Sequence, residues 1–116
     1  MGSRIEDFLE LVGQLEDVQR IESARYSTFK IVGNTFGYLW PRTRTVGLKQ
    51  LVAEQLALVA ERPEVFEVQF TAGQFGWVVV YLDGIDRAEL AELTYEAWRL
   101  TAPAALIESR GDQLPA

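Results

Sequence analysis

The sequence predicts an α+β domain with two layers, in which helices pack on one side of an antiparallel sheet of about five to six strands. Two observations predict it. Apolar residues recur at helical spacing in three segments, and the segments between them alternate with a period of two and are rich in aromatic and β-branched residues. A chain of 116 residues, 48% hydrophobic and 24% charged, is typical of one folded domain. We expect a single domain over residues 1–107 and a frayed tail over residues 108–116.

The first helix is expected to start at the N-terminus and to end near Asp17. Ser3 and Glu6 have the spacing of a capping box, in which the hydroxyl and the carboxylate bind amide groups that the first turn leaves unpaired. The predicted core-facing stripe of this helix consists of Ile5, Phe8, Leu9, Val12 and Leu15.

The next segment predicts an antiparallel meander of four strands, with turn signals at Gly33-Asn34 and at residues 41–44. The strands are expected at about 18–23, 26–32, 35–40 and 45–49. Simple alternation places Phe36, Tyr38 and Trp40 on one face of their strand.

The sequence from residue 50 onward predicts a helix, a pair of strands and a closing helix. A helix over residues 50–62 ends before Pro63, and its apolar stripe is Val52, Leu56 and Val59. Strands are expected over 66–70 and 77–82, and the second is apolar on both faces, as in a strand inside the sheet.

Asp86 and Glu89 predict the start of the last helix, which runs to about Thr101. Its apolar stripe contains Leu90, Leu93, Ala97 and Leu100 and is widened by Ala91, Tyr95 and Trp98.

The composition excludes much familiar chemistry. The chain has no Cys and no His, which rules out disulfides, thiol chemistry, the usual structural zinc sites and every triad with an imidazole base. The acidic residues of the first helix are more simply explained by the helix dipole than by a metal ion. We therefore expect a protein that is not an enzyme and that uses no cofactor or metal. No signal peptide and no apolar run of roughly 20 residues is present, so a cytoplasmic location without membrane association is expected.

Charge is distributed unevenly. The chain has a formal net charge of −6, yet residues 20–49 hold six of its 11 Lys and Arg and only one acidic residue. A basic segment rich in aromatic residues is typical of surfaces that meet phosphate groups and bases.

Several short motifs, in order along the chain, resemble the MmcQ/YjbR-like family. They are the segment 29–36, Gly47-Leu48-Lys49, the tryptophan strand 76–80, Leu82-Asp83-Gly84 and the helix segment 95–100. The resemblance covers residues 4–107. It implies a YjbR-like fold with small helices beside a curved antiparallel sheet and a DNA-binding role for projecting wings, and it implies no known reaction.

The sequence departs from that family at two places. Asn34 stands where family members often carry Lys, and Ala104 and Ala105 follow Pro103 where basic residues are common. Both departures remove positive charge that could contact phosphate.

The strongest candidate surface is therefore the basic meander, and the first hypothesis is weak electrostatic binding of DNA. The residues expected to contact it are Arg25, Lys30, Trp40, Arg42, Arg44 and Lys49. One alternative is that the aromatic residues are core and that the cations solubilise the sheet or pair with the acidic helices. Another is a protein-interaction adaptor that presents the same surface to an acidic partner or to a second copy of the chain, and a small-molecule role ranks third.

Overall fold

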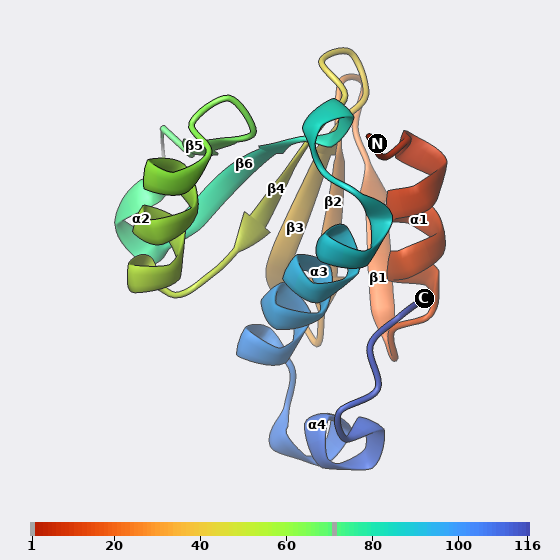
Figure 1. Cartoon of the computed structure of the whole chain (residues 1–116). Helices are drawn as coiled ribbons and strands as arrows, with labels where there is room; N and C mark the ends of the chain where they lie inside the picture. Colours follow the sequence, from red (N-terminus) through yellow and green to blue (C-terminus); the bar gives the residue numbers. More distant parts are fainter. Residues whose placement is uncertain (1, 71) are drawn as a thin grey trace.

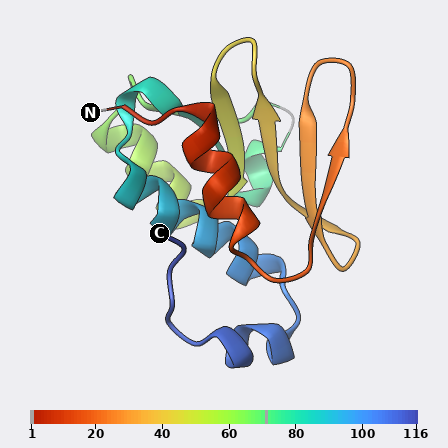
Figure 2. The ribbon, with the colours of Figure 1, turned by 90° about the vertical axis from the view of Figure 1, so that its right-hand side faces the viewer.

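The computed structural model describes residues 2–70 and 72–116, and its strands form one antiparallel sheet in the order β1-β2-β3-β4-β6-β5. The α+β class and the predicted order of elements are confirmed. The strands are β1 (Val18–Glu22), β2 (Ser27–Ile31), β3 (Asn34–Trp40), β4 (Thr45–Lys49), β5 (Phe66–Val68) and β6 (Trp77–Tyr81). The α-helices are α1 (Ile5–Gly13), α2 (Val52–Glu61), α3 (Arg87–Thr101) and α4 (Ala104–Arg110), and two 3-10 turns are η1 (Gly73–Phe75) and η2 (Leu82–Gly84). Helices α1, α2 and α3 lie on the same side of the sheet (Figures 1 and 2).

The core lies between that side of the sheet and the helices. Phe8 of α1 meets Phe29 of β2 edge to face, with ring centroids 5.3 Å apart. Trp98 of α3 is fully buried, and its indole N–H donates to the carbonyl of Glu16 at 3.1 Å. The predicted stripes of α1 and α3 supply much of this core. In the described part of the chain, the helices leave the other face of the sheet uncovered (Figures 1 and 2).

A β-bulge in β3 changes which face its aromatic side chains occupy. Phe29 pairs with Gly37 and Lys30 pairs with Thr35, so Phe36 is an extra residue in β3. Phe36 is fully buried in the core, whereas Tyr38 pairs across the sheet with Thr28 on the opposite face. The expectation that Phe36 shares a face with Tyr38 and Trp40 is therefore wrong, because alternation does not hold across a bulge.

The start of α1 also differs from the expected capping box. Arg4 is the N-cap residue, and its backbone amide donates to the Asp7 carboxylate at 2.7 Å. Ser3 is buried instead, and its hydroxyl donates to the carbonyl of Ile85 at 2.7 Å. Ser3 thus ties the N-terminal segment to the turn before α3 rather than capping α1, which ends at Gly13, earlier than expected.

The buried face of α2 is rotated relative to the expected stripe. Val52 and Leu56 are about half exposed, and Gln55 is the residue of α2 that is buried. The Gln55 side-chain amide donates to the carbonyls of Gly73 at 2.9 Å and Trp77 at 2.6 Å. Burial of this amide, which hydropathy does not anticipate, turns Val52 and Leu56 toward solvent, while Val59 still packs against the core.

The last residues, expected as a frayed tail, make hydrogen bonds to the helical layer. Helix α4 extends to Arg110, whose guanidinium donates to the carbonyl of Gln14 at 2.9 Å. The Tyr95 hydroxyl donates to the carbonyl of Gly111 at 2.6 Å. These hydrogen bonds connect the tail to α3 and to the end of α1 and give it partners that its polar composition does not reveal.

Candidate nucleic-acid interface

The face of the sheet that carries no helix, here called the open face, presents a cluster of four aromatic side chains: Tyr26, Tyr38, Trp40 and Trp77. Tyr38 stacks on Trp40 with centroids 5.7 Å apart and lies 5.3 Å from the ring of Trp77. Tyr26 meets Tyr38 edge to face at 6.2 Å. Tyr38 and Trp40 are only partly buried, so their rings form an apolar surface that a planar group could contact.

Gly47 in β4 makes room for this cluster. A Cβ atom at Gly47 would lie 2.8 Å from the Cη2 atom of Trp40 and 2.6 Å from Oε1 of Gln69. Both distances are shorter than van der Waals contact, so only glycine lets the Trp40 ring lie flat over the sheet here.

A groove of about 500 Å³ lies beside Trp40, between the β3–β4 turn and the end of β5. Arg25, Arg42 and Thr43 line it on the turn side, and Gln69 and Phe70 line it on the β5 side. A second hollow of about 380 Å³ lies between the β1–β2 and β3–β4 turns and is again lined by Arg25 and Arg42. The two turns project from the same end of the sheet as neighbouring wings (Figure 2).

Four cations are left without a carboxylate partner within 4.0 Å in the described part of the chain: Arg25, Lys30, Arg42 and Lys49. Arg25 and Arg42 are exposed on the two wings. Lys30 pairs with Thr35 and Lys49 with Trp77, which places both lysines toward the other end of the open face. Lys49 lies four positions along β4 from Thr45, which is about 13 Å at ~3.3 Å per residue. The free cations therefore form two pairs at opposite ends of the open face, and the aromatic cluster extends from one pair to the other.

Arg44 differs from the other sequence-predicted residues. Its guanidinium donates to the Asp83 carboxylate in η2 at 2.5 Å. Arg44 is also one of the non-glycine residues with positive φ, at 53°. The structure thus brings Arg25, Trp40 and Arg42 together at one groove, places Lys30 and Lys49 on the same face, and directs Arg44 toward an acidic neighbour.

Two residues of the open face were not found from the sequence. The Tyr81 hydroxyl donates to the Glu67 carboxylate at 3.0 Å, and this hydrogen bond, with a smaller effect of burial, raises the pKa of Tyr81 above its usual value. Tyr81 therefore stays neutral, and Glu67 places one negative charge near the groove. Strand alternation could have shown that the two residues share a face, but their pairing depends on β5 lying beside β6.

The described residues include no group of three or more acidic, Cys or His side chains placed to hold a metal ion, and no described helix is long and apolar enough to cross a membrane. The chemistry that the open face offers is that of binding: guanidinium and ammonium donors at both ends and aromatic rings between them.

This geometry defines an α+β protein with helices on one face of a six-stranded antiparallel sheet and a free, aromatic second face. The YjbR family model matches residues 9–100, and the chain belongs to the YjbR family. Among solved structures, it is similar to protein DR2400 of Deinococcus radiodurans, described by the family-model domain DUF419. The TM-score is 0.78 with 16% identity over 92% of this chain and 87% of that one. No curated protein sequence matches it.

Proposed function

We propose that this chain is a non-enzymatic binding module of the cytoplasm whose open face binds DNA weakly, chiefly through charge. The observation that carries the proposal is the position of the free cations. All four described cations without a carboxylate partner, Arg25, Lys30, Arg42 and Lys49, belong to the open face or its wings. A surface that keeps its cations unpaired in a chain with a net charge of −6 is suited to an anionic partner.

The groove and the wings favour a flexible single strand over a duplex. Arg25 and Arg42 would bind phosphates at the wing end, and Lys30 and Lys49 would bind phosphates at the other end. A base of the intervening segment would contact the partly buried face of Trp40, where stacking contributes about 1–3 kcal/mol per base. Arg44, paired with Asp83, would contribute less than its place in the sequence suggests.

The number of proposed phosphate contacts predicts how strongly the affinity for DNA depends on salt concentration. Each phosphate neutralised on a single strand contributes about −0.7 to the slope of log K against log salt concentration. Four contacts therefore predict a slope of about −3. The negative charge of Glu67 and of the helices keeps the affinity low, so binding should be readily measured only at low ionic strength.

The decisive experiment is fluorescence anisotropy with labelled single- and double-stranded DNA at two salt concentrations. Arg25→Ala/Arg42→Ala is expected to reduce affinity at least about tenfold, because it removes both wing contacts. Arg4→Ala/Arg99→Ala is the matched control, since it removes the same charge from the helical side, where both arginines already pair with carboxylates. Equal losses in the two double variants would show that only net charge matters and would refute a site on the open face.

A protein partner is the second candidate, and Phe70 is the observation that favours it. Phe70 lies at the rim of the groove and its side chain is fully exposed, which is unusual for a large apolar residue. Phe70→Ser should weaken an adaptor contact and leave DNA affinity nearly unchanged. Pull-down with and without nuclease separates the two functions, because a partner held through DNA is lost after digestion.

A further inference from the structure

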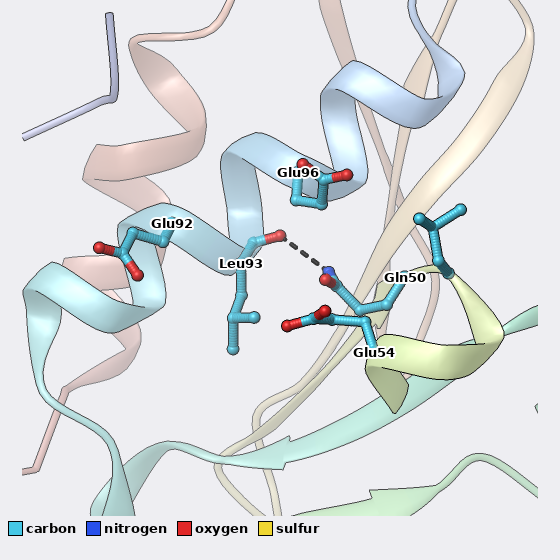
Figure 3. A pocket seen from close by; sticks show the side chains of 6 residues that line it. Gln50, Glu54, Glu92, Leu93 and Glu96 are labelled. Carbon is cyan, nitrogen blue, oxygen red and sulfur yellow. Dashed lines mark hydrogen bonds between the residues drawn. The ribbon is translucent and has the colours of Figure 1, made fainter. Parts of the chain in front are cut away.

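A pocket on the helical side of the sheet is separate from the open face and supports an independent inference. It has a volume of about 310 Å³ and lies between the start of α2 and the middle of α3 (Figure 3). Its lining consists of Gln50, Leu51, Glu54, Glu92, Leu93 and Glu96. This volume is at the lower end of the range for small-molecule pockets.

Gln50 gives the pocket a buried hydrogen-bond acceptor that lacks a donor. Its side chain is 1% exposed, and its Nε2 donates to the carbonyl of Leu93 at 3.0 Å. Oε1 has no hydrogen-bond partner in the described residues. Exchanging the two amide atoms would set Oε1 against another carbonyl oxygen, so the bond to Leu93 fixes the orientation. The pocket therefore presents an acceptor that an N–H group of a ligand can satisfy.

Two carboxylates lie near this acceptor, and a third lies farther away (Figure 3). Glu54 and Glu96 extend on either side of the Gln50 amide, and Glu92 lies beyond Leu93 (Figure 3). Arg99 binds Glu96 at 2.6 Å, whereas Glu54 and Glu92 have no Lys or Arg within 4.0 Å in the described ranges. An unsatisfied acceptor beside unneutralised carboxylates favours a ligand that carries both N–H donors and positive charge.

We propose that this pocket binds a primary alkylammonium ion, and specifically a small aliphatic diamine. One ammonium group donates to Oε1 of Gln50 and to the Glu54 carboxylate, since it has three donors on a compact charge. The alkyl chain packs on Leu93 and on Leu51, whose side chain is 57% exposed. The second ammonium group is then directed toward Glu92 on the far side of Leu93. A bare divalent cation fits less well, because the described residues include no group of three or more acidic side chains placed to hold one.

The test is titration of the ¹⁵N-labelled full chain with 1,5-diaminopentane, followed by amide chemical shifts and by calorimetry. We expect saturable binding in the millimolar range or tighter, with shifts concentrated at Gln50, Glu54 and Leu93. Glu54→Gln should weaken binding about tenfold by removing one charge-assisted contact. Glu61→Gln, an exposed acidic position at the other end of α2, is the matched control and should bind as the wild type does. Absence of saturation, shifts located elsewhere, or equal affinities of the two variants would overturn the proposal.

Three further probes identify the chemistry that is recognised. Pentylamine should bind more weakly than the diamine, and tetramethylammonium, which has charge but no N–H donor, should not bind. Stronger binding of Mg²⁺ than of the diamine would refute an organic ligand. Binding of Nα-acetyl-lysine methylamide without binding of the diamine would assign the pocket to a lysine side chain of a protein and would overturn the assignment to a free amine.

Discussion

Substitution of Gly76 tests the tightest packing around any glycine in the described part of the chain. Gly76 has φ of +90° and lies where the turn η1 enters β6, against the end of β4. A Cβ atom there would lie 1.9 Å from the carbonyl oxygen of Gln50. Gly76→Ala must therefore separate the two segments as well as adopt an unfavourable backbone conformation.

The expected loss of stability follows from the contacts that Gly76→Ala removes. A positive φ costs an alanine about 1–2 kcal/mol. Separation of the segments breaks the hydrogen bond from the amide of Gln50 to the carbonyl of Gly76, at 3.2 Å, and disturbs the buried bond from Gln50 to Leu93. At about 1 kcal/mol each, these losses bring the expected decrease in the free energy of unfolding to about 3–4 kcal/mol.

Gly33→Ala is the matched control. Gly33 also has positive φ, at +80°, but a Cβ atom there would meet nothing within 4 Å. The free energy of unfolding of the Gly33→Ala variant should therefore decrease only by the conformational cost, about 1–2 kcal/mol. Urea unfolding followed by tryptophan fluorescence measures both variants. If Gly76→Ala is no more destabilising than Gly33→Ala, the η1 turn does not contact the end of β4 and the reasoning is refuted.

Three further predictions concern acid stability, a buried amide and the open face. Asp7→Asn should lower stability at pH 7 by about 1–2 kcal/mol, because the backbone amide of Arg4 and the guanidinium of Arg87 hold the pKa of Asp7 below its usual 3.8. That contribution is present above pH 3.8 and is lost as the pH falls through the depressed folded-state pKa, so urea titrations at pH 7 and pH 3 should show the difference shrinking. Gln55→Leu should cost about 1–2 kcal/mol because it removes two buried hydrogen bonds, while both carbonyls keep a backbone donor, the amides of Gly76 and Gln69. A cost below about 0.5 kcal/mol in the same assay would contradict the role of the Gln55 amide. Gly47→Ala should displace the Trp40 ring, which shifts tryptophan emission to longer wavelength and weakens DNA binding. The free energy of unfolding should decrease by about 1–2 kcal/mol. Unchanged emission would show that the ring does not lie over Gly47.

Periodicity predicted most of the fold because packing follows it in the long elements. The stripe of α3 and the interior position of β6 are confirmed, since each depends on hydrophobic residues at one regular spacing. The helix α2 failed this rule because Gln55 is buried for its hydrogen bonds, and its amide satisfies carbonyls that are distant in sequence.

The candidate interface was predictable only in part. The charge excess of residues 20–49 led directly to Arg25 and Arg42, which line one groove. The pairing of Arg44 with Asp83 was not visible, because 39 residues separate them along the chain. Tertiary contacts of this kind decide which cations are free, and no local pattern reports them.

The bulge at Phe36 makes the chemistry of the open face depend on a single inserted residue. One strand supplies aromatic rings both to the interior, at Phe36, and to the exterior, at Tyr38 and Trp40. A relative that lost one residue here would keep nearly the same composition yet reverse the orientation of one half of the strand. Family members that share the aromatic cluster should therefore be recognised by the length of this segment. The number of tryptophans and tyrosines that they contain is a poorer guide.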